Sequence, residues 1–81
     1  MVIAELNRKK KVVGLNQVKR AVNKGEAELV IVAKDIDRRI FKELMDVVGR
    51  SGVKVEFVDS KEMLGRAAGI KRPASSVALL K

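Results

Sequence analysis

The stretch Leu29-Val30-Ile31-Val32-Ala33 decides the fold of this chain. It is a continuous apolar run made mostly of β-branched residues. Such a run predicts a strand that is buried on both faces, because a half-exposed strand would alternate apolar with polar residues. A strand of this kind implies a sheet that is covered by helices on both sides.

The segments around this run alternate between helical and strand patterns. The pattern before the run predicts a short helix over residues 2–9, a strand at Val12-Val13, and a helix over residues 16–24 that stops at Gly25. After the run, Asp35 is a candidate cap for a helix that continues to Gly49. These predictions place one strand and three helices around the central run.

The second half of the chain continues the alternation. Val53, Val55 and Phe57 alternate with Lys54 and Glu56, which predicts a half-exposed strand. The remaining elements are a helix over residues 60–67, opened by a possible capping box of Asp59 and Glu62, a loop over Ile70-Lys71-Arg72-Pro73-Ala74, and a strand over residues 76–80. The order αβαβαβαβ with short connections predicts an α/β fold, a three-layer α/β/α sandwich around a mixed four-stranded sheet, as one domain over residues 1–81.

Composition limits the function classes. The chain of 81 residues has 18 basic and 10 acidic residues, a net charge of +8 and a pI of about 10.2, which favours a polyanionic partner. It has no cysteine and no histidine, so disulfides, thiolate chemistry and imidazole metal sites are excluded. We therefore expect a protein that is not an enzyme and that needs no metal or cofactor.

Two further absences shape the expectation. The sequence has no apolar run near 20 residues and no signal-peptide pattern, so we expect a cytoplasmic protein that makes no use of a membrane. Its only aromatic residues are Phe41 and Phe57, which leaves little material for stacking bases. An RNA ligand would have to be recognised by its shape, its phosphates and its base edges.

The stretch from Gly14 to Arg20 is the strongest candidate for a binding site. Gly14 allows a sharp turn, and Asn16 is a candidate cap for the helix that follows. The start of this helix carries Gln17, Lys19 and Arg20 beside free backbone amides, a combination that suits a phosphate backbone and base edges. An ordinary capped amphipathic helix with a solvated basic face would give the same pattern.

Two other motifs have simpler interpretations. Asp35 and Asp37 are two residues apart and could hold Mg²⁺, but a helix cap with a first-turn charge explains them better. The segment from Gly65 to Gly69 lacks the ending of a phosphate-binding loop, and close helix packing with a helix end accounts for its glycines. Neither motif points to catalysis.

Three blocks of the sequence resemble one family. They are Gly14-x-Asn16-Gln17-x-x-Arg20-Ala21-Val22-x-x-Gly25, then residues 29–37 with Asp35 and Asp37, then Leu64-Gly65-x-Ala67-x-Gly69-Ile70-x-Arg72-Pro73 followed by Ser76-Val77-Ala78. Together they are similar to the L7Ae family of ribosomal proteins, which includes the L30e type and the kink-turn binders of small ribonucleoprotein particles. The resemblance covers nearly the whole chain and is closest to the bacterial, ribosomal-protein-like members. It implies an L30e-like fold.

The resemblance also implies a ligand. Kink-turn RNA is a duplex that is sharply bent at a bulge beside tandem sheared G·A pairs. By position in the motif, Gly14 would allow close approach of the RNA, Asn16 and Gln17 would contact guanines, and Arg20, with Lys19 beside it, would hold phosphates. Gln17 stands where the family usually has an acid, and Arg20 stands at the family's lysine, so the pairing pattern with the bases changes.

The second contact implied by the resemblance is the loop before the last strand. There Ile70, Lys71, Arg72, Pro73 and Ala74 would cover bases that are flipped out of the bulge. Asp37 and Phe41 lie where family members help to form a pocket for a protruding nucleotide. The implied partner is RNA, as ribosomal RNA or a structured messenger or riboswitch element, with possible association with the ribosome; we expect the protein to be a monomer.

Two other functions fit the same composition. A small basic α/β domain could be a protein-interaction or ribosome-docking module without kink-turn specificity. It could also be an unspecific basic binder, whose affinity would ignore RNA shape and vanish with salt. The crowding of Asn, Gln and Arg at one helix start, rather than an exposed apolar patch, favours RNA.

Overall fold

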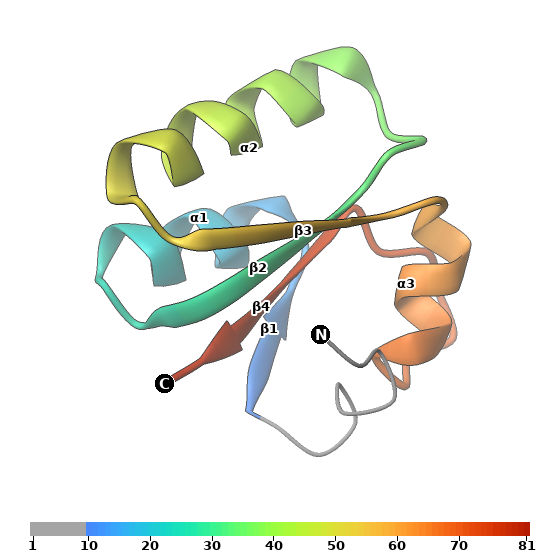
Figure 1. The fold of residues 1–81 in the computed structure, drawn as a ribbon. Coiled ribbons are helices and arrows are strands. Elements are labelled where there is room, and N and C mark those ends of the chain that lie inside the picture. Colours follow the sequence, from blue (N-terminus) through green and yellow to red (C-terminus); the bar gives the residue numbers. More distant parts are fainter. Residues whose placement is uncertain (1–9) are drawn as a thin grey trace.

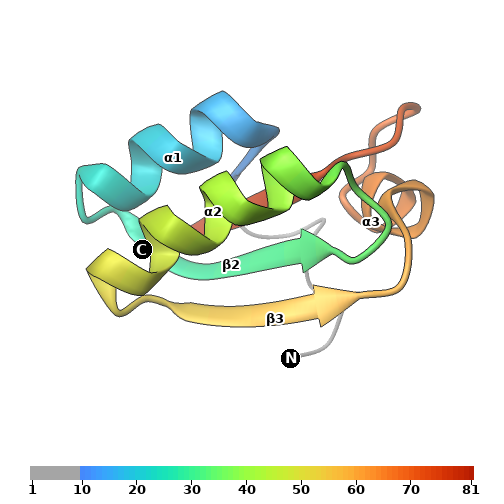
Figure 2. The same cartoon turned by 90° about the horizontal axis from the view of Figure 1, so that it is seen from above.

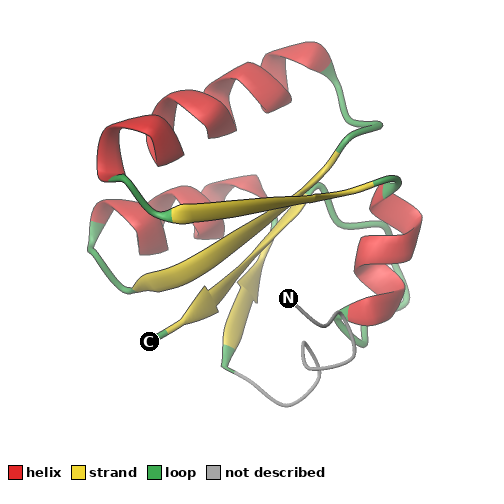
Figure 3. Ribbon diagram, in the orientation of Figure 1, coloured by secondary structure: helices red, strands yellow, loops and turns green. Residues whose placement is uncertain are grey.

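Strands and helices alternate along the chain. The computed structural model describes residues 10–81, and the helix predicted over residues 2–9 lies outside that range. The described elements are β1 (Lys11–Val13), α1 (Leu15–Asn23), β2 (Ala27–Ala33), α2 (Arg38–Ser51), β3 (Lys54–Val58), α3 (Lys61–Ala67) and β4 (Ser76–Leu80), as Figure 3 shows by colour.

The four strands form one mixed sheet in the order β1-β4-β2-β3. Strand β2 runs parallel to β3, whereas β4 is antiparallel to both β1 and β2. Helices α1 and α2 cover one face and α3 covers the other (Figures 1 and 2). The predicted three-layer sandwich with a mixed four-stranded sheet is therefore confirmed.

Strand β2 is the centre of both halves of the core. All its residues are buried except Glu28, as the apolar run predicts. Val30 and Val32 pack with the buried residues of α1 and α2, among them Val18 and Leu44. On the other side Leu29, Ile31 and Ala33 pack with buried residues of α3 and β4, which include Leu64, Ala68, Val77 and Leu79. The alternation of β2 thus supplies both cores from one strand.

The start of α2 differs from the prediction. The cap is Asp37, whose Oδ1 accepts a hydrogen bond from the backbone N–H of Arg39 at 2.8 Å. Asp35 instead accepts from the backbone N–H of Lys61, the first residue of α3, at 2.7 Å. The prediction was wrong because both acids can cap a helix locally, and the choice depends on α3, which lies 26 positions further along the chain.

Three other helix ends also differ. Gly14, not Asn16, is the N-cap residue of α1, and no side chain in the described range caps that helix. Ser60 caps α3 by accepting from the N–H of Met63 at 3.0 Å, in place of the capping box of Asp59 and Glu62. Helix α2 runs past Gly49 to Gly52, whose φ of 75° closes it in the left-handed conformation.

Phe57 of strand β3 is more exposed than the alternation suggests. Val58 is buried with the α3 side of the core, and Phe57 is 44% exposed. The expected half-exposed strand is present, but β3 lies at the edge of the sheet, where α2 only partly covers it. Within residues 10–81, none of the helices combines the length and apolar character that crossing a bilayer requires.

Gly65 determines how closely the segment before β4 packs on α3. A Cβ at this position would lie 1.9 Å from the backbone carbonyl oxygen of Arg72 and 3.2 Å from the Cα of Pro73. Only a residue without a side chain allows that approach. The N–H of Ala74 also donates to the carbonyl of Lys61 at 2.9 Å, so both ends of α3 hold this loop.

Replacement of the α3 cap tests the observed boundary. Ser60→Ala removes the side-chain acceptor for the N–H of Met63 and should lower the free energy of unfolding by about 1 kcal/mol. The exposed Asp59 serves as control, because Asp59→Ala should change stability by less than about 0.5 kcal/mol. Urea denaturation measures both. A larger loss for Asp59→Ala would restore the predicted capping box.

Substitution of two helical glycines tests the loop contact. Gly65→Ala should lower the free energy of unfolding by about 1–3 kcal/mol and shift the amide resonances of residues 70–75, because the Arg72 carbonyl must move. The control is Gly49→Ala, where an added Cβ meets no atom within 4 Å, and stability should rise by about 0.5–1 kcal/mol. Equal effects on stability would show that the contact does not constrain the loop.

Candidate functional site

Gly14 joins the sheet to the first helix. It has a φ of 97°, a conformation that residues with side chains rarely adopt. Its N–H donates to the carbonyl of Ser76 at 2.9 Å, and its own carbonyl accepts from the N–H of Val18 at 3.0 Å. The start of α1 is thereby fixed beside the start of β4, which places it next to the loop that precedes β4.

The first turn of α1 is open to solvent on its polar side. Asn16, Gln17 and Arg20 are exposed, while Val18 is buried in the core. The first turn holds no acidic residue and has no side-chain cap among the described residues. Its free amides and the positive end of the helix dipole therefore face solvent beside two carboxamides. Arg20, expected at the helix start, lies instead in the last turn, because α1 ends at Asn23.

Lys19 is less available than its neighbours. Its Nζ donates to Oε1 of Glu43 on α2 at 2.8 Å, and its side chain is 29% exposed. This contact ties α1 to α2 at the surface. Arg20 has no ion pair within the described range, and with Gln17 it lines a shallow hollow of about 180 Å³ next to Val12 and Ala21. Of the two cations of α1, Arg20 is therefore the freer one.

The loop before β4 presents charge on its outer side. Lys71, Arg72 and Pro73 are exposed, Ile70 is half-buried, and Ala74 is only 2% exposed because its methyl group lies in the core. The carbonyl of Ser75 accepts from the N–H of Ala33 at 3.0 Å, which fixes the end of the loop against β2. Ala74 positions the loop but offers little surface to a ligand.

A groove of about 510 Å³ is lined by residues from several segments of the chain, some of which belong to the predicted site. Its walls come from the starts of three helices and from the loop before β4: Val13, Gly14, Ile36, Asp37, Ile40, Lys61, Ile70, Arg72, Pro73, Ala74 and Ser75. Six residues predicted from the sequence line this groove, namely Gly14, Asp37, Ile70, Arg72, Pro73 and Ala74. The fold brings these six residues to one concave surface, whereas Lys71 and the predicted residues of α1, namely Asn16, Gln17, Lys19 and Arg20, do not line it.

Lys61 is the charged groove residue that the sequence analysis missed, and the lining residues Val13, Ile36, Ile40 and Ser75 were not predicted either. It is exposed at the first position of α3, and its N–H is held by the carboxylate of Asp35. As a single lysine at a helix start it carries no distinctive pattern. Its position could have been inferred only from the sheet order, because β3 and β4 both flank β2 and bring the start of α3 to the loop.

The two aspartates at the end of β2 have structural partners. Each accepts a backbone N–H at a different helix, Asp35 at α3 and Asp37 at α2. The described residues contain no group of three carboxylate, histidine or cysteine side chains that could hold a metal ion. Helix capping explains both acids, and Asp37 remains at the groove while doing so.

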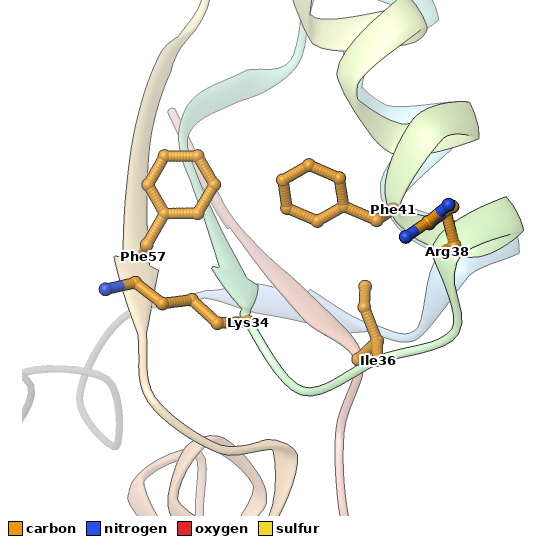
Figure 4. A pocket seen from close by; sticks show the side chains of 5 residues that line it. All are labelled: Lys34, Ile36, Arg38, Phe41 and Phe57. Atoms are coloured by element: carbon orange, nitrogen blue, oxygen red, sulfur yellow. The ribbon is translucent and has the colours of Figure 1, made fainter.

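Phe41 does not join the groove. Its ring lies on the other side of the first turns of α2, in a second hollow with Phe57, Lys34 and Arg38 (Figure 4). Ile40, one position earlier, faces the groove instead. Ile36 borders both hollows, so the start of α2 forms a wall between them.

Comparison with known proteins identifies the family of this chain. A family model described as the ribosomal protein L7Ae/L30e/S12e/Gadd45 family matches residues 2–81. An RNA-binding protein of Geobacillus sp. (strain WCH70) is 40% identical over 72 residues, which cover 89% of this chain and 88% of that protein. The RNA-binding protein YbxF of Geobacillus stearothermophilus is 40% identical over 70 residues, covering 86% of this chain and 85% of that protein.

The fold has a close counterpart among solved structures. The 15.5kD RNA binding protein of Giardia lamblia superposes with a TM-score of 0.86 at 32% sequence identity, covering 98% of this chain and 68% of that one. Sequence similarity and fold similarity therefore both extend over almost the whole chain. The resemblance inferred from the three sequence blocks is confirmed, and this chain belongs to the ribosomal protein L7Ae/L30e/S12e/Gadd45 family.

Proposed function

We propose that this protein binds RNA without catalysing a reaction, and that it recognises kink-turn RNA through the groove between α1 and the loop before β4. The observation that carries the proposal is that Gly14, at the open start of α1, lines one groove with Arg72 of that loop, while the exposed Asn16 and Gln17 follow directly in the first turn. The relatives named above are called RNA-binding proteins, which supports the ligand class. The proposed cellular setting is the cytoplasm, in association with the ribosome.

The start of α1 has the chemistry for G·A pairs. The carboxamides of Asn16 and Gln17 each carry one acceptor and two donors, so they can pair with guanine and adenine edges. The guanidinium of Arg20 offers a planar set of donors to guanine oxygens or phosphates. Because Gln17 is neutral, it can both accept from and donate to a base, whereas an acid could only accept.

The loop before β4 has the chemistry for the bulge. Lys71 and Arg72 can neutralise phosphates, which crowd together where the RNA bends. The apolar surfaces of Ile70 and Pro73 lie beside them and can cover bases that have left the stack. Lys61, at the far wall of the groove, adds a third cation for the same phosphates or for a protruding nucleotide.

Binding of this kind would select the bent RNA. The groove is concave and its contacts come from separated elements, so an extended duplex cannot satisfy both walls at once. The protein would then shift the RNA toward the kinked state by its difference in affinity for the two shapes. A protein-docking module without RNA-shape specificity predicts no such shift.

The decisive test compares two RNA duplexes. One carries a consensus kink-turn, and the other has its G·A pairs replaced by Watson–Crick pairs, with donor and acceptor dyes on the two arms. Tight binding and increased energy transfer for the first duplex only would support the proposal. Equal, salt-sensitive binding to both would indicate an unspecific basic binder, and no binding to either would favour a protein partner.

Substitutions on α1 test the base contacts. Asn16→Ala and Arg20→Ala should each weaken kink-turn binding by about 1–3 kcal/mol, because each removes donors that can face base edges. Their circular dichroism and unfolding midpoints should stay unchanged, since both side chains are exposed. Arg50→Ala is the charge-matched control for Arg20→Ala, because Arg50 lies in the last turn of α2, at the end of that helix that does not line the groove. Near-normal affinity of both α1 variants would rule out this face.

Substitutions in the loop test the phosphate contacts. Replacing Lys71 and Arg72 together by alanine should lower affinity for kink-turn and control duplex alike. The slope of log K against log salt should become shallower by about 1 for each lost phosphate contact. Fluorescence anisotropy at several salt concentrations measures the slope, with Arg20→Ala for comparison. An unchanged slope would show that the loop does not touch phosphate.

A further inference from the structure

The two aromatic residues of the chain lie together at the surface, away from the groove. Phe41 comes from α2 and Phe57 from β3, with ring centroids 6.1 Å apart and ring planes inclined by 29°. With Ile36, Lys34 and Arg38 they line a hollow of about 460 Å³ (Figure 4). Phe57 remains 44% exposed, so the hollow presents apolar surface to solvent.

This hollow lies at an edge of the sheet. In the range that the structure describes, β3 pairs with β2 and with no other strand. The carbonyl of Val58 accepts from the N–H of Lys34 and therefore points toward β2. Backbone groups alternate sides along a strand, so the N–H and C=O of Phe57 and Val55 point to the outer edge.

The outer edge of β3 and the hollow can be reached by the same incoming residue. A strand added beside β3 would place the side chain opposite Phe57 on the same face of the sheet as the Phe57 ring. That is the face covered by α2, because Val55, two positions earlier, packs against the core between α2 and the sheet. One incoming residue can thus form backbone hydrogen bonds at Phe57 and insert its side chain into the hollow.

The rim of the hollow is positive. Arg38 is exposed and forms no ion pair with any described residue. Lys34 has one weak contact, 3.9 Å from the carboxylate of Asp59, with both side chains more than half exposed. An incoming segment with carboxylates two positions from its apolar residue would meet both cations on the same face.

We propose that the outer edge of β3 binds an extended segment of an acidic partner protein by strand addition. An apolar side chain fills the hollow between Phe41 and Phe57, and flanking carboxylates contact Lys34 and Arg38. Main-chain pairing gives affinity, and the hollow and its rim give specificity. The edge geometry favours a peptide over RNA, because a sugar–phosphate chain cannot continue a β-ladder. The proposal does not depend on the kink-turn function.

The test begins with peptides. The full chain is screened against a phage-displayed library of random dodecapeptides, and an enriched sequence is synthesised with a fluorescent label. The expected sequences combine one bulky apolar residue with Asp or Glu two positions away on one or both sides. Their affinity should fall with added salt, since the charged rim is exposed. Enrichment without an apolar–acidic pattern would overturn the proposal.

Variants then assign the binding to this edge. Val55→Pro removes an N–H that faces outward, so the pairing of β3 with β2 is kept while strand addition is blocked. Phe57→Lys places a charge at the hollow, and Arg38→Glu reverses the rim. Each should weaken peptide binding roughly tenfold or more. Arg50→Glu, a charge reversal at the far end of α2, should change it by less than about twofold. If Val55→Pro fails to fold, the other two decide.

Two parallel measurements exclude other occupants. Kink-turn binding should be the same for Phe57→Lys as for the unmodified chain, and a loss would assign the hollow to RNA and overturn the proposal. Sedimentation should show that the peptide binds a monomer. A dimer that Phe57→Lys converts to monomers would identify a second copy of this chain as the occupant, which would also overturn it. Retained peptide affinity in both Phe57→Lys and Arg38→Glu would likewise overturn the proposal.

Discussion

Burial of β2 on both faces is the constraint on which the rest of the structure depends. A strand that is apolar on both sides is stable only between two helical layers, and its neighbours β3 and β4 must then flank it in the same sheet. Since β4 runs antiparallel to β2, the end of β2 meets the start of β4. The starts of α1, α2 and α3 and the loop before β4 gather at that end, and the groove forms where they meet.

The fold followed from the sequence because its signals are periodic. The apolar run of β2 and the helical spacing of α2 each extend over several residues, and glycines mark the ends of elements. A single exception therefore does not change the predicted element. The predictions of the helix starts failed because each start depends on a single hydrogen bond. Asp35 and Asp37 are equivalent to a local argument, and only the position of the Lys61 N–H separates them. Likewise Ser60, and not Asp59, caps α3, because its side chain accepts the hydrogen bond from the N–H of Met63.

The candidate site was predicted unevenly. The exposed residues of α1 and of the loop stood in recognisable blocks; the structure brings Gly14 and most of the loop to one groove, while Asn16, Gln17 and Arg20 lie outside its lining. Lys61 had no sequence signal, since its place depends on strand order. Ile40 and Phe41 are adjacent on α2 and point about 100° apart, so they face different hollows, and spacing alone could not tell which of them lines the groove. Lys19 pairs with Glu43, a contact 24 positions away in the chain.

The position of β4 between β1 and β2 has a consequence for how the molecule is made. Strand β1 pairs with no described strand except β4, although the two are separated by more than sixty positions. During synthesis, β1 and the start of α1 must therefore wait until residues 76–80 have emerged before the sheet can close. Such a distant pairing slows folding, because the intervening chain must lose conformational entropy before the contact between β1 and β4 can form and stabilise the sheet. Until that moment a nascent chain has its basic helix but lacks the surface on which a ligand could be recognised.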